Sequence, residues 1–517
     1  MQKISSIRHA FALRRACLGA LLALALAAPA VHAQQALRPP AAGPVMSAAQ
    51  WRQAAVDDIE AAYLITLDDH PGVYDPANPA FAGNLEQARE GGLSLAAKVR
   101  DGAGYAAALQ HFNALLGDGR AGVVLKDMPP STPRWPGFIS AWRGENMFVV
   151  STTPGGPAVG ARIADCDGKP IGQLVESNVF DFGQRSGGNG PWWSFAPDVF
   201  IDQGNPFITL PVQCIFIDEG RESRLTLSWR PMDEAAQRLR DDSFNGITQP
   251  IGITTPRPGL YWAALPTFQP TDIERAAYGT LVREVQQNRQ RYQDGDAVVI
   301  DLRGNQGGDA AWALKFAQAL WGEARVNRRI KLAQARQAVW WRASFANIAH
   351  TSFEAARQSE QQPTPRQLDY DPVAISRGML AAQSRDDKFY PDPAPAVVIS
   401  DSDRADSLPG DPPAFTKRVY VVVPGQCSGA CLEALDVFSL FPNTKLIGAP
   451  SAGDSSYTDI RLEPLKSGLA SVIVPAKMVV NRPRGAGTYY TPAILVNDLE
   501  WSQRAFLKAI EADLAKR

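Results

Sequence analysis

The chain has 517 residues, of which 45% are hydrophobic and 20% charged, proportions that are typical of a globular protein. Its length predicts two or three domains. The formal net charge of −1 becomes −5 without the first 33 residues, because that stretch holds four basic and no acidic side chains. A chain with this charge is not expected to take nucleic acid or an anionic membrane as its main partner.

Residues 1–33 have the pattern of a secretory signal peptide. A basic start precedes the apolar stretch 18–28, and Val31-His32-Ala33 is a small-residue cleavage site. We therefore expect export to the periplasm or the cell exterior. No later apolar run is long enough to span a bilayer. Residues 34–46, rich in Pro and Ala, are predicted to form a disordered tether.

Residues 47–130 are predicted to form an N-terminal helical cap. Apolar residues recur at helical spacing over 47–67, 85–99 and 105–116. The last of these helices leads into LLGDGRAGVV, which contains Arg120.

Residues 136–232 are predicted to be β-rich, with short β-branched or alternating segments such as 147–151 and 211–217. Within this region the Gly-rich stretch 183–193 carries two tryptophans. It is expected to be a loop whose aromatic rings cover a domain junction or clamp a substrate.

Residues 250–517 are predicted to form an α/β core. Residues 297–302 are an apolar, β-branched run suited to a strand buried on both faces, and the glycine turn 303–308 and a helix follow it. A second unit of strand, small-residue turn and helix covers 417–441. Residues 326–332 are predicted as a further strand, and 340–385 as helical. Both turns are expected at the same edge of one sheet, where α/β proteins bind ligands.

Four cysteines remain after the signal peptide, and an even number in an exported chain permits two disulfides. They are Cys166, Cys214, Cys427 and Cys431. A bridge between the last two would brace the second turn. Zinc is the alternative for this pair, but no histidine lies nearby and the spacing is not that of a zinc finger, so no metal site is predicted.

Three motifs together resemble the tail-specific, or C-terminal-processing, serine peptidase family. This family carries DLRGNxGG, then a serine at the start of a helix, then a strand that ends in GxPTxG. The corresponding stretches here are 301–308, 428–433 and 448–453. Residues 158–171 also resemble the central part of a PDZ domain. The resemblance implies a crotonase-like α/β core, a PDZ-like domain and a helical cap, as in tricorn-core relatives.

The family resemblance implies an exported serine-type peptidase that hydrolyses peptide bonds near the C-termini of peptide or protein substrates, without a cofactor. Ser428 would be the nucleophile, although a serine in this place also suits a simple helix cap. Backbone N–H groups of Gly307 or Gly308 and of Gly429 would form the oxyanion hole. The sequence does not indicate an oligomeric state.

The general base is where the chain departs from the family pattern. Lysine-type relatives place the base where this chain has Asp454, and histidine-type relatives place it where this chain has Arg120. Arginine stays protonated, and an ordinary aspartate is a weak base for a serine hydroxyl. Asp454 is therefore a candidate catalytic residue that would orient another group or accept the proton itself.

The three histidines after the signal peptide, His70, His111 and His350, are interpreted as structural. The alternative to a peptidase is a catalytically inactive family member that binds a peptide or a small apolar ligand. The family has a non-enzymatic retinoid-binding relative, so such a role has a precedent.

Overall fold

The computed structural model describes residues 46–126, 132–183, 189–359, 370–393 and 397–516. The predicted signal peptide and nearly all of the predicted tether lie outside these residues. None of the helices in the described ranges combines the length and apolar character needed to cross a bilayer.

The central sheet contains both predicted strands and places them side by side. Its strand order is β10-β11-β12-β15-β16-β19, and all neighbours are parallel except β10 and β11. β12 and β15 are buried almost throughout, as predicted for strands covered on both faces. The strands are β10 (Gly252–Arg257), β11 (Leu260–Ala264), β12 (Ala297–Asp301), β15 (Arg418–Val423), β16 (Thr444–Gly448) and β19 (Ile494–Leu495).

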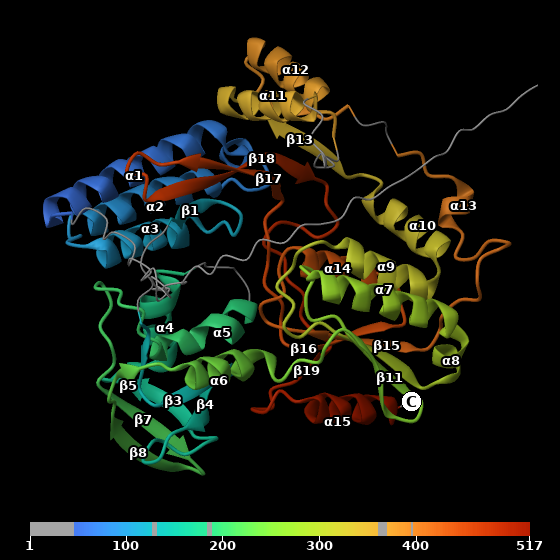
Figure 1. Ribbon diagram of the computed structural model, residues 1–517, viewed down its shortest axis with the longest axis horizontal. Helices are drawn as coiled ribbons and strands as arrows, with labels where there is room; N and C mark the ends of the chain where they lie inside the picture. Colours follow the sequence, from blue (N-terminus) through green and yellow to red (C-terminus); the bar gives the residue numbers. More distant parts are fainter. Residues whose placement is uncertain (1–45, 127–131, 184–188, 360–369, 394–396, 517) are drawn as a thin grey trace, which may run out of the picture. The chain divides into compact units, whose positions relative to one another are not determined.

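Helices cover the two faces of this sheet unequally (Figure 1). On one face, a core built with alternate residues of β12 and β15 includes buried side chains of α7 (Asp272–Gln287), α9 (Ala311–Trp321) and α14 (Ala430–Phe438). The C-terminal helix α15 (Gln503–Leu514) packs against the other face. Because β12 and β15 are parallel neighbours, the turns that follow them emerge at the same sheet edge, which confirms the prediction.

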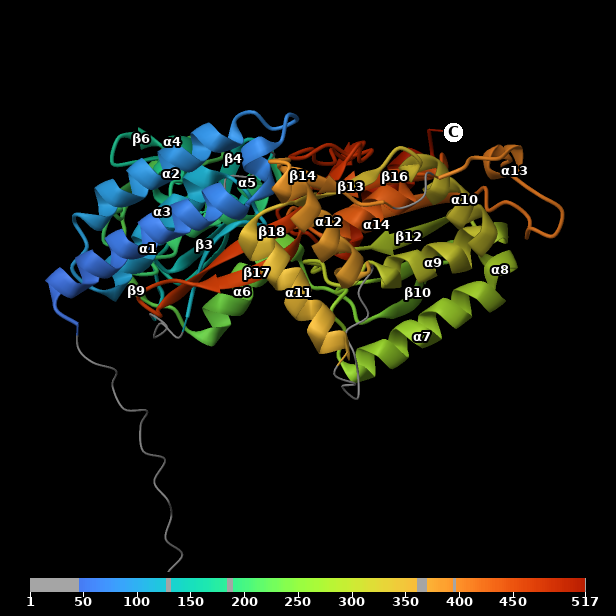
Figure 2. The same ribbon diagram turned by 90° about the horizontal axis from the view of Figure 1, so that it is seen from above.

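A second sheet joins segments from both ends of the chain, which the sequence did not predict. Its order is β1-β18-β13-β14, and β17 also pairs with β18. Buried residues of β18 share a core with α1, α2 and α3, and Figures 1 and 2 both show these helices beside β17 and β18. The elements are α1 (Ala48–Asp69), α2 (Phe81–Ala96), α3 (Gly102–Leu116), β1 (Gly122–Leu125), β13 (Ala338–Arg342), β14 (Phe389–Pro391), β17 (Tyr457–Pro464) and β18 (Ala470–Val480).

The predicted β-rich region forms a third sheet of order β3-β4-β5-β7-β8, with β6 paired to β5. Cys166 and Cys214 are direct partners on β5 and β7 and form a disulfide. The elements are β3 (Phe138–Arg143), β4 (Asn146–Thr152), β5 (Arg162–Cys166), β6 (Lys169–Pro170), α4 (Ile171–Val175), η2 (Glu176–Phe180), α5 (Asn189–Phe195), η3 (Ala196–Phe200), β7 (Gln213–Asp218), β8 (Arg221–Thr226) and α6 (Glu234–Asn245). A separate two-stranded sheet pairs β2 (Arg134–Trp135) with β9 (Arg230–Pro231).

Several sequence predictions of local structure were wrong. Residues 326–332, predicted as a strand, lie inside the helix α10 (Glu323–Gln334), where Val326 and Ile330 are four apart on one face. Residues 340–385 begin in β13 and continue through two separate helices. The loop predicted over 183–193 already enters α5 at its end. The remaining elements are η1 (Pro71–Tyr74), α8 (Arg289–Asp294), α11 (Phe345–Ser359), α12 (Pro372–Ser384) and α13 (Asp401–Arg404).

Candidate active site

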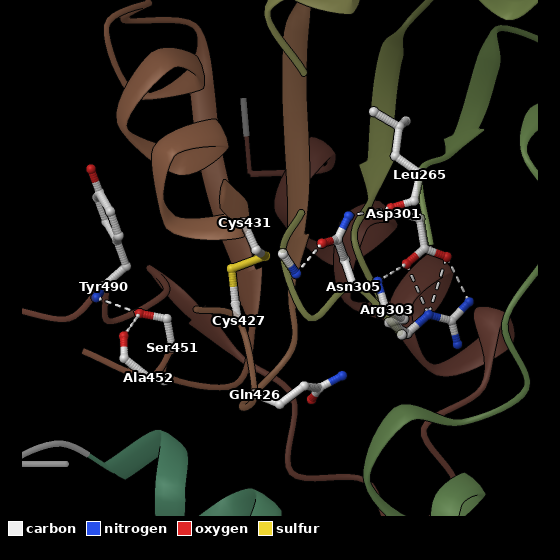
Figure 3. Close-up of a disulfide and its surroundings, with 12 residues drawn as sticks. Leu265, Asp301, Arg303, Asn305, Gln426, Cys427, Cys431, Ser451, Ala452 and Tyr490 are labelled. Atoms are coloured by element: carbon white, nitrogen blue, oxygen red, sulfur yellow. Dashed lines mark hydrogen bonds and ion pairs between the residues drawn. A yellow bond between two sulfur atoms is a disulfide. The ribbon is translucent and has the colours of Figure 1, made fainter. Parts of the chain in front are cut away.

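The first glycine turn is held in place by a buried ion pair. Arg303 contacts Asp301 through Nη2 at 2.8 Å (Figure 3), and Trp262 donates to the same carboxylate at 3.0 Å. Arg303 Nη1 also donates to the carbonyl oxygen of Trp501 at 2.8 Å. These two residues of the DLRGN motif therefore shape the turn, and neither is exposed to a substrate.

Asn305 sets the backbone path of the turn. Its side-chain Nδ2 donates to the carbonyl of Leu265, and its Oδ1 accepts the N–H of Gly307 at 2.9 Å. Gly307 has a φ of +104°, and a Cβ there would lie 3.0 Å from the carbonyl oxygen of Ser428. Only glycine fits this close approach without a shift, so the two turns are in direct contact. The N–H of Gly307 already has an acceptor inside the turn.

The second turn carries Ser428 between two bonded cysteines. Cys427 and Cys431 form a disulfide, one of the pairings that the four cysteines permit, and both are fully buried (Figure 3). Because the two sulfurs are bonded to each other, the pair is not a zinc site. The N-cap of α14 is Gly429, with no side-chain cap, so Ser428 does not cap the helix. In the described part of the chain the half-buried Ser428 hydroxyl has no hydrogen-bond partner.

Ser428 lies on the wall of a cavity of about 500 Å³. The core contributes Gln306 and Gln426 to this cavity, and α5, η3 and α6 contribute most of the rest. A Cβ at Gly190, in the first turn of α5, would come within 2.3 Å of the carbonyl oxygen of Ser451. This absence of a side chain lets α5 pack tightly over the second turn. The β-rich region and the core thus enclose the serine together.

Two backbone donors beside Ser428 are uncommitted. The N–H groups of Gly308 and Gly429 have no acceptor among the residues that the structure describes. Gly308 is exposed, and Gly429 is the residue directly after the serine. Of the three predicted oxyanion residues, these two have donors available, whereas the donor of Gly307 is used within its own turn.

Asp454 is surrounded by three arginines and is nearly inaccessible, with 5% of its side chain exposed. Arg484 Nη1 lies 2.5 Å from one oxygen, Arg482 Nη1 lies 3.2 Å away, and Arg120 Nη2 lies 3.6 Å away. Arg484 also forms a two-pronged contact with Asp436 at 2.8 and 3.0 Å. Burial lowers the pKa of Arg484, but the two carboxylates raise it above its ordinary value overall.

This cluster, which we call the Asp454 cage, contains the two positions that the sequence resemblance aligns with a general base. The side chains at these two positions, Arg120 and Asp454, pair with each other. The oxygens of Asp454 are committed to guanidinium groups. The sequence pointed to Arg120 and Asp454 but not to the roles of Arg482 and Arg484. The two arginines within the four residues 481–484 (NRPR) were the feature that could have indicated them.

The histidines lie in other parts of the structure. His70 is fully buried and stacked on Phe81, and it accepts the N–H of Gly72 through Nδ1 at 2.9 Å. Burial lowers the pKa of His70 to about 3, so the ring is neutral at physiological pH. His111 contacts the backbone of Asp181, and His350 lies 4.0 Å from Asp459. The cavity that holds Ser428 is not lined by any of the three.

Removal of the two disulfides should lower the free energy of unfolding by different amounts. The Cys166–Cys214 bridge closes a loop with a sequence separation of 48, and Cys427–Cys431 closes one of 4. In the chain-entropy description, replacing both cysteines by alanine lowers the free energy of unfolding by about 4 kcal/mol for the first bridge and about 2 kcal/mol for the second. Urea denaturation of the two double variants measures this order, and a reversed order would contradict it.

The fold has known counterparts among solved structures. It is similar to the structure of mature CPAF complexed with lactacystin, with a TM-score of 0.56 and 12% identity over 90% of this chain and 99% of that one. The crystal structure of mature CPAF gives 0.56 and 13% over 90% and 98%. The photosystem II D1 C-terminal processing protease gives 0.35 and 13% over 89% and 97%. No protein-family model matches the chain, and no curated protein matches it. The likeness to mature CPAF is a likeness of fold.

Proposed function

We propose that this chain is a serine-type peptidase that hydrolyses peptide bonds near the C-termini of peptide or protein substrates, with Ser428 as the nucleophile. The observation that carries the proposal is the position of Ser428. Its hydroxyl has no hydrogen-bond partner among the described residues, Ser428 lines a cavity of about 500 Å³, and its carbonyl oxygen lies at the contact between the two glycine turns. A shape and size of this kind suit a site for a small molecule or a peptide segment.

The proposed chemistry uses the backbone around the serine. Ser428 Oγ attacks the substrate carbonyl carbon, and the carbonyl oxygen becomes an oxyanion. The N–H groups of Gly308 and Gly429, which have no acceptor among the described residues, would stabilise that charge. The hydroxyl proton must pass to a base within ~3 Å, directly or through one water. Because the oxygens of Asp454 are paired with arginines, we assign Asp454 the role of orienting another group and not that of accepting the proton. We therefore expect slow turnover.

The same proposal includes the finer architecture and the compartment. We assign the central sheet and its helices to a crotonase-like core, and the third sheet to a PDZ-like domain. We also propose that the protein is exported, to the periplasm or outside the cell. Two disulfides within the described residues support an oxidising compartment.

A second candidate function, peptide binding without turnover, is favoured by one observation. The ion pair between Arg120 and Asp454 fills both places where relatives carry a base. A guanidinium cannot accept the serine proton. The two candidates share the same cavity, and they differ only in whether Ser428 reacts.

A serine-directed fluorophosphonate probe distinguishes the two functions. We expect the parent protein to be labelled at Ser428, Ser428→Ala to remain unlabelled, and the exposed control Ser384→Ala on α12 to label like the parent. Lactacystin, the compound complexed with mature CPAF, serves as a second probe. Peptide hydrolysis should disappear in Ser428→Ala while peptide binding stays nearly unchanged. Hydrolysis by Ser428→Ala at the parent's rate would exclude Ser428 as the nucleophile.

A further inference from the structure

The cavity beside Ser428 has an uneven charge that the catalytic proposal does not use. Its lining includes three charged residues, Asp198, Arg240 and Asp241, and all three come from η3 and α6. The rest of the lining is uncharged, with several glutamine and aromatic side chains. What the cavity prefers to bind therefore depends on how these three charges are distributed.

The charge of Arg240 is cancelled within the cavity wall. Its Nε and Nη2 both donate to Asp198 Oδ1, at 2.8 and 2.6 Å, and Nη2 also donates to the carbonyl oxygen of Ser194 at 2.7 Å. The guanidinium is nearly buried, so this pair is screened little by solvent. Asp198 and Arg240 together contribute no net charge.

Asp241 is the charge that remains. Its Oδ1 accepts one hydrogen bond, from Gln237 at 3.3 Å, and among the described residues it has no basic partner within ion-pair distance. The side chain is exposed, so a ligand can reach it. The cavity thus carries one surplus negative charge close to the candidate nucleophile, which favours a cation and disfavours an anion.

Two further groups in the same wall lack a partner. Ser194 is 3% exposed and Arg240 is 6% exposed, and yet Ser194 Oγ and Arg240 Nη1 have no hydrogen-bond partner in the described parts of the chain. Buried donors of this kind are costly unless something accepts their hydrogen bonds. Both atoms are almost inaccessible, so the exposed charge of Asp241, and not these donors, sets the preference of the cavity.

We propose that this cavity binds an extended peptide segment that carries a lysine or arginine side chain near the bond at Ser428. Asp241, which lines the cavity and has no basic partner among the described residues, attracts the cationic group. A preference among substrates rests on the proposed peptidase function, whereas the binding of such a peptide does not. Because Asp241 is exposed, we expect the preference to be about two- to fivefold, as for other exposed ion pairs.

Binding to the Ser428→Ala protein tests the preference without hydrolysis. The probes are fluorescein-labelled decapeptides in three matched sets, with lysine, norleucine or glutamate placed in turn at each of the last six positions. At the best position, fluorescence anisotropy should give a Kd for lysine two- to fivefold below that for norleucine, with glutamate weakest. Raising the salt concentration from 50 to 500 mM should shrink the difference.

Asp242 supplies a matched control, because it is exposed on the same helix but does not line the cavity. In the Ser428→Ala background, Asp241→Asn should abolish the preference for lysine, and Asp242→Asn should keep it. Equal Kd values for the three sets, no binding at all, or equal effects of the two asparagine variants would overturn the proposal. If the preference is found but the parent hydrolyses nothing, the peptidase function fails and the binding site stands. If the parent hydrolyses peptides but shows no preference for lysine, the peptidase function stands and the proposed binding preference fails.

Discussion

Replacing Asp454 with alanine is expected to lower the free energy of unfolding by about 3–5 kcal/mol, the usual cost of removing one partner of a buried ion pair. Only 5% of the Asp454 side chain is exposed. Its carboxylate lies between Arg482 and Arg484, which are themselves largely buried. Without it, three guanidinium groups including that of Arg120 would share one pocket with less negative charge. Urea denaturation with an unchanged m-value measures the loss.

An exposed ion pair provides the comparison for this variant. Asp386 contacts Lys388 at 2.7 Å on the surface, and Asp386→Asn, which removes the charge and tolerates the φ of +62° there, should cost far less than Asp454→Ala. If the free energy of unfolding of Asp454→Ala lies within about 1 kcal/mol of that of the parent, the Asp454 cage does not stabilise the protein. The cage also explains why a lysine-type base is absent: an ammonium group at position 454 would face three like charges.

Replacing Arg120 with histidine is expected to raise peptide hydrolysis by about a hundredfold, the lower range for gaining a general base. The sequence resemblance aligns position 120 with the base of histidine-type relatives, and the Arg120 guanidinium lies 3.6 Å from Asp454. A neutral imidazole there could accept the proton of Ser428, and Asp454 could hold the ring in the required tautomer, as the carboxylate does in serine triads. The initial rate on a peptide substrate measures the gain.

The matched control is Arg120→Gln, which removes the charge without supplying a base. It should leave hydrolysis near the parent level, and only the histidine variant should show activity that falls as the pH drops below about 6.5. An equal rise in both variants would mean that loss of the ion pair with Asp454 increases the rate. No rise in either would mean that position 120 is not within reach of Ser428.

Much of the candidate site could be predicted from the sequence because its parts are local. An apolar, β-branched run followed by glycines predicts a buried strand and a tight turn, and this holds for 297–308 and 417–429. The bridge between Cys427 and Cys431 joins residues four apart, so its prediction required no knowledge of the tertiary structure. Ser428 and the two glycine turns were found for the same reason.

Only the tertiary structure decided what surrounds these parts. The charged and apolar residues of α10 suit a strand or a helix over a short window, and packing on the core selected the helix. β18 pairs with β1 across more than three hundred residues, which no local pattern encodes. Asp454 meets Arg120 in the same way, and Ser428 meets the cavity wall of α6. The sequence by itself determined the turns and the candidate nucleophile, whereas long-range packing determined the charges around them, because those charges come from segments that only the fold brings together.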